Sequence, residues 1–163
     1  MSLRIGIVVD GLVERVVGGE VRIANGGVGV YIHELVRHLL ELEDDHEYFL
    51  LRCGVGRHAI YGDPRATPVF LPAGLRQRLG RLADLPYRWL ARDLRLDVVH
   101  QPNQLGLLAI PREVRRVVTV HDLTPFALPW AHRLRTVVRN RALLAPTVRG
   151  ADPRAVPALP RLN

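Results

Sequence analysis

The chain has 163 residues, of which 48% are hydrophobic and 24% are charged, so it is long enough for one folded domain with a core. All 23 basic residues are arginine. Because there is no lysine, P-loop nucleotidases and enzymes that form a Schiff base on lysine are excluded. The net charge of +7 would favour nucleic-acid binding. The arginines, however, are spread along the chain, and aromatic residues make up only 6%. We therefore expect no nucleic-acid partner.

Cysteine usage and the start of the chain indicate the compartment. Cys53 is the only cysteine, which excludes an internal disulfide and a cysteine-rich zinc cluster. The first apolar run ends at Asp10 and is too short for a signal peptide or a membrane span. From these features we expect a cytoplasmic protein.

The first third of the chain is typical of a strand, a helix and a second strand. Residues 3–9 form a mostly aliphatic run that includes Arg4 and Gly6, as in a strand buried on both faces of a parallel sheet. Residues 12–23 alternate loosely around two glycines, which indicates a hairpin or a mobile loop. Apolar side chains then recur at helical spacing over 28–40, and residues 48–53 form another buried-strand run.

The rest of the chain is less regular, because prolines and arginines interrupt the apolar pattern. Two short β-branched runs each end in a histidine, and these runs are typical of strands. The predicted elements are strands over 67–71, 97–100 and 117–121, a helix over 75–94 that is interrupted or kinked at Pro86, and a basic helix over 131–145.

Three polar side chains follow predicted strands. Asp10 ends the first strand, and His100 and His121 end the last two. In open parallel sheets, ligands bind in the crevice beyond the carboxyl ends of the strands. The sequence therefore predicts that Asp10, His100 and His121 gather at one rim of the sheet.

Two motifs in this order resemble glycosyltransferase family four. The first is Gly-Gly-Val-Gly-Val-Tyr over residues 26–31, directly before the predicted helix, and the second is Val-Thr-Val-His-Asp-Leu-Thr-Pro over residues 118–125. The resemblance covers most of residues 3–145. It implies an α/β fold, a Rossmann-like parallel sheet with helices on both faces, as one half of a GT-B architecture. It also implies a retaining transferase that uses a nucleoside-diphosphate sugar such as GDP-mannose or a UDP-sugar.

The resemblance assigns roles toward the donor. Gly27 and Gly29 would approach the donor diphosphate, because glycines allow close backbone approach and a helix amino-terminus offers free N–H groups. His121 would face the donor sugar, where an imidazole binds a hydroxyl or stabilises oxocarbenium-like charge. Asp122 would either orient His121 or cap the following loop, and the sequence leaves both roles open.

Other polar residues are candidates for acceptor binding or for a metal. Asp10, His100 and Asn103 are candidates for binding acceptor hydroxyls. The His121-Asp122 doublet also occurs at the metal sites of phosphohydrolases, but those sites need further ligands on helices, and the remaining histidines lack ligand spacing. We therefore expect no bound metal and no cofactor, with the nucleotide sugar entering as a substrate.

Domain organisation and partners follow from the same resemblance. We expect a Rossmann-like acceptor-side domain over 1–145 and an irregular, proline-containing tail over 146–163, with the carboxyl-terminal donor-binding domain absent. Such a chain would be a truncated fragment, a split-gene product or the product of an altered reading frame, inactive without a separate donor-binding domain. The alternative is a non-catalytic, ligand- or partner-binding Rossmann-like module. Arginines and leucines over 75–95 would also suit peripheral contact with an anionic membrane.

Overall fold

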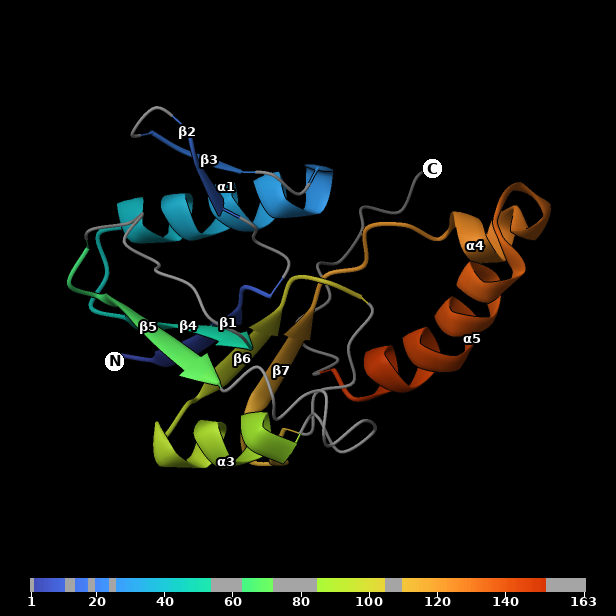
Figure 1. The fold of residues 1–163 in the computed structure, drawn as a ribbon. Helices are drawn as coiled ribbons and strands as arrows, with labels where there is room; N and C mark the ends of the chain where they lie inside the picture. Colours follow the sequence, from blue (N-terminus) through green and yellow to red (C-terminus); the bar gives the residue numbers. More distant parts are fainter. Residues whose placement is uncertain are drawn as a thin grey trace, which may run out of the picture.

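The computed structural model describes residues 2–10, 14–17, 20–23, 26–53, 63–71, 85–104 and 110–151. Its centre is a five-stranded sheet in which every neighbouring pair of strands is parallel (Figure 1). This confirms the predicted α/β fold with a Rossmann-like sheet. In spatial order the strands are β5 (Ala66–Leu71), β4 (Glu47–Cys53), β1 (Arg4–Val8), β6 (Val98–Gln101) and β7 (Arg115–Val118).

The strand order defines where a ligand can enter. The chain builds outward from β1 through β4 to β5, and then crosses back to add β6 and β7 on the other side of β1. The connections therefore leave β1 and β6 in opposite directions. Such a switch point opens a crevice at the carboxyl ends of the two strands.

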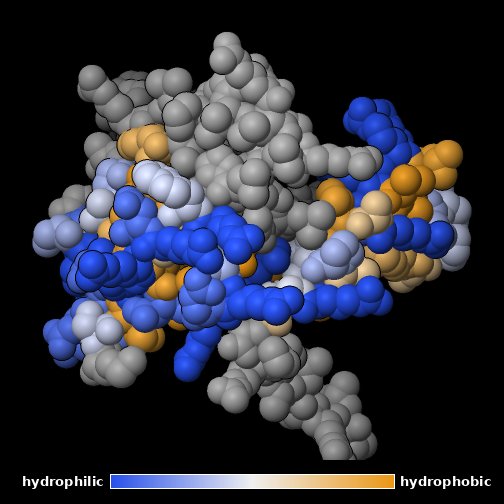
Figure 2. Space-filling view, turned by 90° about the horizontal axis from the view of Figure 1, so that it is seen from below, coloured by the Kyte–Doolittle hydropathy of each residue, from blue (hydrophilic) through white to orange (hydrophobic). Residues whose placement is uncertain are grey.

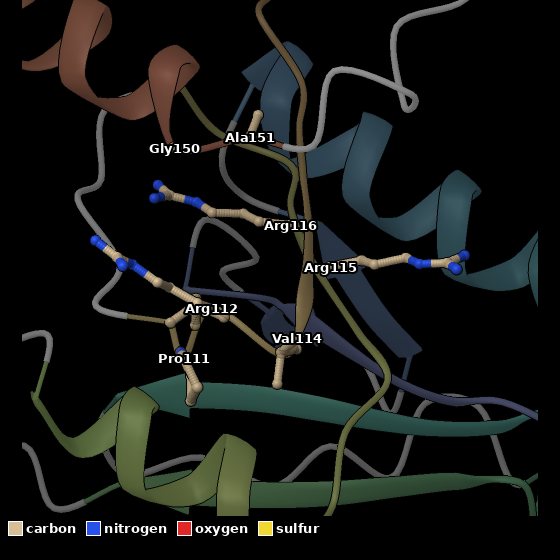
Figure 3. A pocket seen from close by; sticks show the side chains of 8 residues that line it. Pro111, Arg112, Val114, Arg115, Arg116, Gly150 and Ala151 are labelled. Atoms are coloured by element: carbon tan, nitrogen blue, oxygen red, sulfur yellow. The ribbon is translucent and has the colours of Figure 1, made fainter.

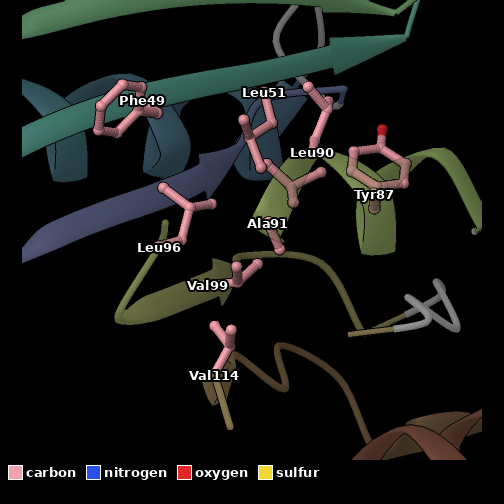
Figure 4. Packing of buried hydrophobic residues seen from close by; sticks show 9 residues of the cluster. Phe49, Leu51, Tyr87, Leu90, Ala91, Leu96, Val99 and Val114 are labelled. Carbon is pink, nitrogen blue, oxygen red and sulfur yellow. The ribbon is translucent and has the colours of Figure 1, made fainter. Parts of the chain in front are cut away.

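Helices cover both faces of the sheet, as predicted. On one face α1 (Gly26–Glu41) buries Ile32 and Val36 against Ile7 of β1. On the other face α3 (Leu85–Asp93) packs Leu90 in a cluster that includes Val8 of the same strand (Figure 4). Consecutive residues of β1 serve opposite cores because side chains alternate along a strand. Each fully buried aliphatic side chain contributes about 1.5–3 kcal/mol.

The segment between β1 and α1 contains a β-hairpin. Strand β2 (Glu14–Val17) pairs antiparallel with β3 (Glu20–Ile23), and Glu14 lies opposite Ile23. Of the two alternatives that the sequence left open, the hairpin is confirmed. It lies beside α1 (Figure 1).

Two prolines lie within helices. Pro86 is the second residue of α3 and does not kink it, because proline fits the first turn of a helix, where its missing N–H has no partner to lose. Residues 72–84, which include half of the predicted 75–94 helix, lie outside the described residues. Helix α5 (Leu134–Arg149) continues through Pro146, so residues 146–149, expected to begin the irregular tail, are helical. Gly150 N–H donates to Pro146 O at 3.1 Å and closes the last turn.

The last strand is also shifted from its predicted position of 117–121. Strand β7 begins at Arg115 and ends at Val118, so His121 lies three residues beyond it. Arginine is accommodated in the strand because the buried Arg116 guanidinium donates to Gln101 Oε1 at 2.9 Å. The chain then forms a short helix α4 (Thr124–Ala127) and a 3₁₀ turn η2 (Pro129–Ala131), neither of which the sequence predicted.

No helix in the described ranges combines the length and the apolar character needed to cross a bilayer.

Candidate functional site

Side chains from three elements meet beyond the carboxyl ends of β6 and β7. Nε2 of His100, on β6, lies 2.8 Å from Oγ1 of Thr119, which follows β7. The same hydroxyl lies 3.2 Å from the phenol oxygen of Tyr31 on α1. This hydrogen-bond chain fixes the first turns of α1 against the rim of the sheet.

His121 is held at this rim in one orientation. Its Nε2 lies 2.7 Å from the carbonyl oxygen of Pro102, which follows β6. Because a carbonyl only accepts, Nε2 carries a proton, and in the neutral ring Nδ1 is therefore the acceptor. The ring meets Tyr31 edge-on, with ring centroids 4.8 Å apart and planes at 82°. His121 is exposed, so a fixed imidazole is presented to solvent at the rim.

The backbone around His121 is held by Gln104, a residue that the sequence did not single out. Gln104 is buried, and its Oε1 accepts from the N–H of His121 at 2.7 Å and from the N–H of Asp122 at 3.0 Å. Its Nε2 donates to the carbonyl of Asp122 at 2.7 Å and lies 3.5 Å from Oδ1 of Asn140 on α5. One buried carboxamide therefore connects the rim, the His121 loop and the last helix.

The glycines of the first motif begin α1 on the same side as this rim. Gly26 adopts a φ of +54°, a conformation that favours glycine, and a Cβ placed on Gly26 or Gly27 would meet nothing within 4 Å. Gly29 is buried in the first turn, which contains no acidic residue. Tyr31, one turn after Gly27, is the residue that contacts His121. The amino-terminus of α1 and the imidazole thus line one wall.

A glycine-led helix thus contacts a histidine at the rim of a parallel sheet. The family model described as Glycosyltransferase Family 4 matches residues 25–153, which include both motifs and the whole of α1, β6, β7 and α5. The chain belongs to glycosyltransferase family 4. Neither the comparison with curated proteins nor that with solved structures found a match. The parallel sheet is that of the amino-terminal domain of this family, whose members bind sugar donors and acceptors.

The carboxylate of Asp122, the second residue of the family 4 His-Asp motif, hydrogen-bonds to Thr124 instead of the His121 ring. Its Oδ1 accepts from the N–H of Thr124 at 2.7 Å and its Oδ2 from the hydroxyl of Thr124 at 2.9 Å. The bond from the Thr124 hydroxyl is the main reason that the pKa of Asp122 is lowered. The carboxylate therefore caps the turn into α4, which is one of the two roles that the sequence left open.

His100 lies behind Thr119. Burial lowers its pKa from 6.5 to about 4, and the nearby His121 adds to the shift. At neutral pH the ring is uncharged. A neutral ring bonded to Thr119 can stiffen the rim, and it reaches Tyr31 only through that hydroxyl.

The other two predicted acceptor residues also follow strands that border the switch point. Asp10 follows β1, and its Oδ2 accepts from the hydroxyl of Tyr87 on α3 at 2.8 Å. Asn103 follows β6, and its carbonyl accepts from Nε2 of Gln101 at 2.7 Å. Both residues are half-buried. Both residues thus lie at the carboxyl end of the sheet, which was predicted for Asp10, and Asp10 is hydrogen-bonded to α3.

A cavity of about 360 Å³ lies at the other end of the strands, where β7 begins and α5 ends (Figure 3). Arg112, Arg115 and Arg116 line it together with Gly150. Figure 3 shows Arg112 and Arg116 extending to one side and Arg115 to the opposite side, so the three cations do not converge on one point. Because ligands of parallel sheets bind at the carboxyl ends, this cavity is separate from the family 4 site.

Within the described ranges, no three histidine, cysteine or carboxylate side chains come together as a metal site. The prediction that no metal binds is left to elemental analysis. Sequence reasoning missed Gln104 and Tyr31 as parts of the site. The signal for Gln104 was available in the run of amides and proline that directly follows β6, at the carboxyl end where ligand-side residues belong.

Proposed function

We propose that this chain is the acceptor-side half of a retaining glycosyltransferase, which moves a sugar from a nucleoside-diphosphate sugar to an acceptor hydroxyl. The observation that carries the proposal is the shared wall: Tyr31 of the glycine-led helix contacts the ring of His121 at 4.8 Å between centroids. Membership of family 4 supports the reaction class. The described residues form one Rossmann-like sheet, and a GT-B enzyme closes its site between two.

On the donor side, we assign the diphosphate to the amino-terminus of α1. The unpaired N–H groups there and the helix dipole favour an anion, and no carboxylate in the first turn competes for it. The empty space over Gly27 would allow the phosphate oxygens to approach the backbone. Gly29 is buried, so its contribution would be to helix packing or through its N–H.

At the reacting sugar, we assign the main role to His121. With the proton of Nε2 committed to Pro102, Nδ1 is left as an acceptor for a sugar hydroxyl, and protonation would convert it into a donor near developing negative charge. The neutral ring or its dipole can also stabilise oxocarbenium-like charge at the reacting carbon. Asp122 would act by shaping the loop that carries the histidine.

For the acceptor, we assign Asp10 and Asn103, because polar groups at the switch point suit a hydroxyl-rich ligand. His100 would support this region from behind, as its ring is bonded to Thr119. A donor-binding domain would close the opposite wall. Without it, we expect the chain to be inactive.

The proposal can be tested by binding. Saturation-transfer NMR and calorimetry with UDP-glucose and GDP-mannose should give weak or no binding to the chain alone, and clear binding after addition of the donor-binding half of a complete family 4 member. His121→Ala should weaken the second complex. If the added domain changes nothing and the nucleotide sugars never bind, the chain is better described as a non-catalytic binding module.

A further inference from the structure

The arm formed by α4, η2 and α5 carries an exposed apolar surface. Trp130 and Leu134 are each 78% exposed, the largest exposures among the large hydrophobic side chains described. Single exposed hydrophobic residues are ordinary, but a group of them marks an interaction site. Figure 2 shows hydrophobic residues gathered beside hydrophilic ones at the end of the molecule that α4 and α5 form. We call this group the arm surface; it comprises Leu123, Leu128, Trp130, Leu134 and Val138.

The arm is also strongly basic. Residues 123–151 contain five arginines and no aspartate or glutamate. On α5, Leu134 and Val138 are one helical turn apart and form an apolar row. The exposed Arg135 and Arg139 repeat the same spacing in the adjacent row, and Arg141 lies on the other side. The apolar row is thus flanked by cations on both sides.

Helix α5 packs on the domain through residues other than those of the apolar row. Val137, Asn140, Leu144 and Thr147 are the buried residues of the helix, and they lie on a different face from the apolar row. The apolar row therefore does not belong to the core of this domain. It needs a partner that offers both an apolar environment and negative charge.

We infer that the arm surface docks on an anionic lipid bilayer, with Trp130 and Leu134 entering the headgroup region and the arginines meeting lipid phosphates. Indole rings favour the membrane interface, and cationic residues near an anionic leaflet add to binding. A second copy of the chain is a poorer occupant, because a symmetric contact through the arm surface would bring arginines against arginines. The inference concerns a surface other than 75–95, and it does not depend on sugar transfer.

Docking here would bring the rim of the sheet toward the bilayer. The arm follows Asp122 directly, and Oγ1 of Thr124 lies 2.9 Å from the Asp122 carboxylate and 2.8 Å from Nε2 of His132. The first part of the arm is therefore tied to the loop that carries His121.

The two tryptophans of the chain allow the surface to be mapped directly, because Trp130 lies on the arm surface and Trp89, 65% exposed, lies on α3. Full-length Trp89→Phe and Trp130→Phe variants, each with one remaining indole, are mixed with vesicles of equal parts phosphatidylcholine and phosphatidylglycerol, and with phosphatidylcholine alone. We expect the emission of Trp130 to shift to shorter wavelength and to be quenched by brominated lipid only in the anionic vesicles. The emission of Trp89 should stay unchanged.

Charge variants complete the test. Arg135→Gln with Arg139→Gln should lower flotation with anionic vesicles by about fivefold for each arginine, while Arg88→Gln with Arg92→Gln on α3 should have little effect. The inference is overturned if Trp130 emission does not respond to anionic vesicles, or if Trp89 responds in its place. It is also overturned if Trp130 shifts without lipid as the protein concentration rises, since that result would assign the surface to a second copy.

Discussion

Replacing Gln104 by methionine should loosen the His121 loop while keeping the core filled, because the two side chains have similar length and volume. The substitution removes three hydrogen bonds, of 2.7, 3.0 and 2.7 Å, to the backbone of His121 and Asp122. A buried backbone group left without a partner costs about 1–3 kcal/mol. Since the side chains of both loop residues are exposed, water can replace part of this bonding. We therefore expect a loss of about 2–4 kcal/mol in the free energy of unfolding.

The assay combines urea denaturation with amide NMR of the loop. In Gln104→Met, the amide protons of His121 and Asp122 should move upfield and exchange faster with solvent, as they lose a short acceptor. Gln101→Met is the matched control, because Gln101 is the other glutamine buried within the described residues and it bonds Arg116 and Asn103 instead of the loop. It should also lower stability while leaving the two loop amides protected.

Two results would refute this reasoning. Either Gln104→Met leaves the amide exchange of the His121 loop unchanged, or Gln101→Met deprotects that loop equally. In both cases the position of His121 would not depend on Gln104.

Three further predictions concern pH, the donor side and the core. Folding lowers the pKa of His100 from 6.5 to about 4. The unfolded chain therefore takes up this proton at a higher pH than the folded chain, so the free energy of unfolding should decrease by at most about 3 kcal/mol as the pH falls from 6.5 to about 4. In denaturation series at each pH, His100→Gln should show a smaller decrease. Gly27→Ala should keep or raise the melting temperature, since its Cβ meets open space, yet weaken nucleotide-sugar binding in the two-domain complex by about tenfold. Gly6→Ala should cost about 1–3 kcal/mol in urea denaturation, because its Cβ would lie 2.7 Å from Leu96 Cδ1 and 3.1 Å from Leu51 Cδ1.

The elements with a strong apolar period were predictable from the sequence. The run at 3–9 and the helical spacing over 28–40 each report burial directly, because a parallel strand is covered on both faces and α1 on one. The end of β7 was not predictable in the same way. Thr119 and Val120 continue the β-branched run beyond Val118, yet the strand stops there. The last backbone N–H that donates to β6 is that of Thr119, to Gln101 O. Tertiary pairing decides such a boundary, and local composition does not report it.

The site was predictable in its location and only partly in its contacts. The carboxyl-end rule placed Asp10, His100 and His121 at one end of the sheet, because each follows a strand of the expected parallel sheet. The sequence did not distinguish Asp122 as a cap from Asp122 as a partner of the imidazole, because both roles need the same residue at the same position. The position of Gln104 after β6 was a readable signal, but its hydrogen bonds to the His121 loop join residues 17 positions apart, and no local pattern identifies that partner.

The most direct test of the site is nucleotide release from a sugar donor, since it needs no known acceptor. The chain fused to the donor-binding half of a complete family 4 member is incubated with UDP-glucose and with GDP-mannose, and the free nucleoside diphosphate is measured. We predict release by the fusion, absent from either half alone, that falls by about a hundredfold in His121→Ala while the fold is retained. Release that is undiminished by His121→Ala, or no release from a folded fusion with either donor, would contradict a sugar-transfer role for the wall formed by α1 and His121.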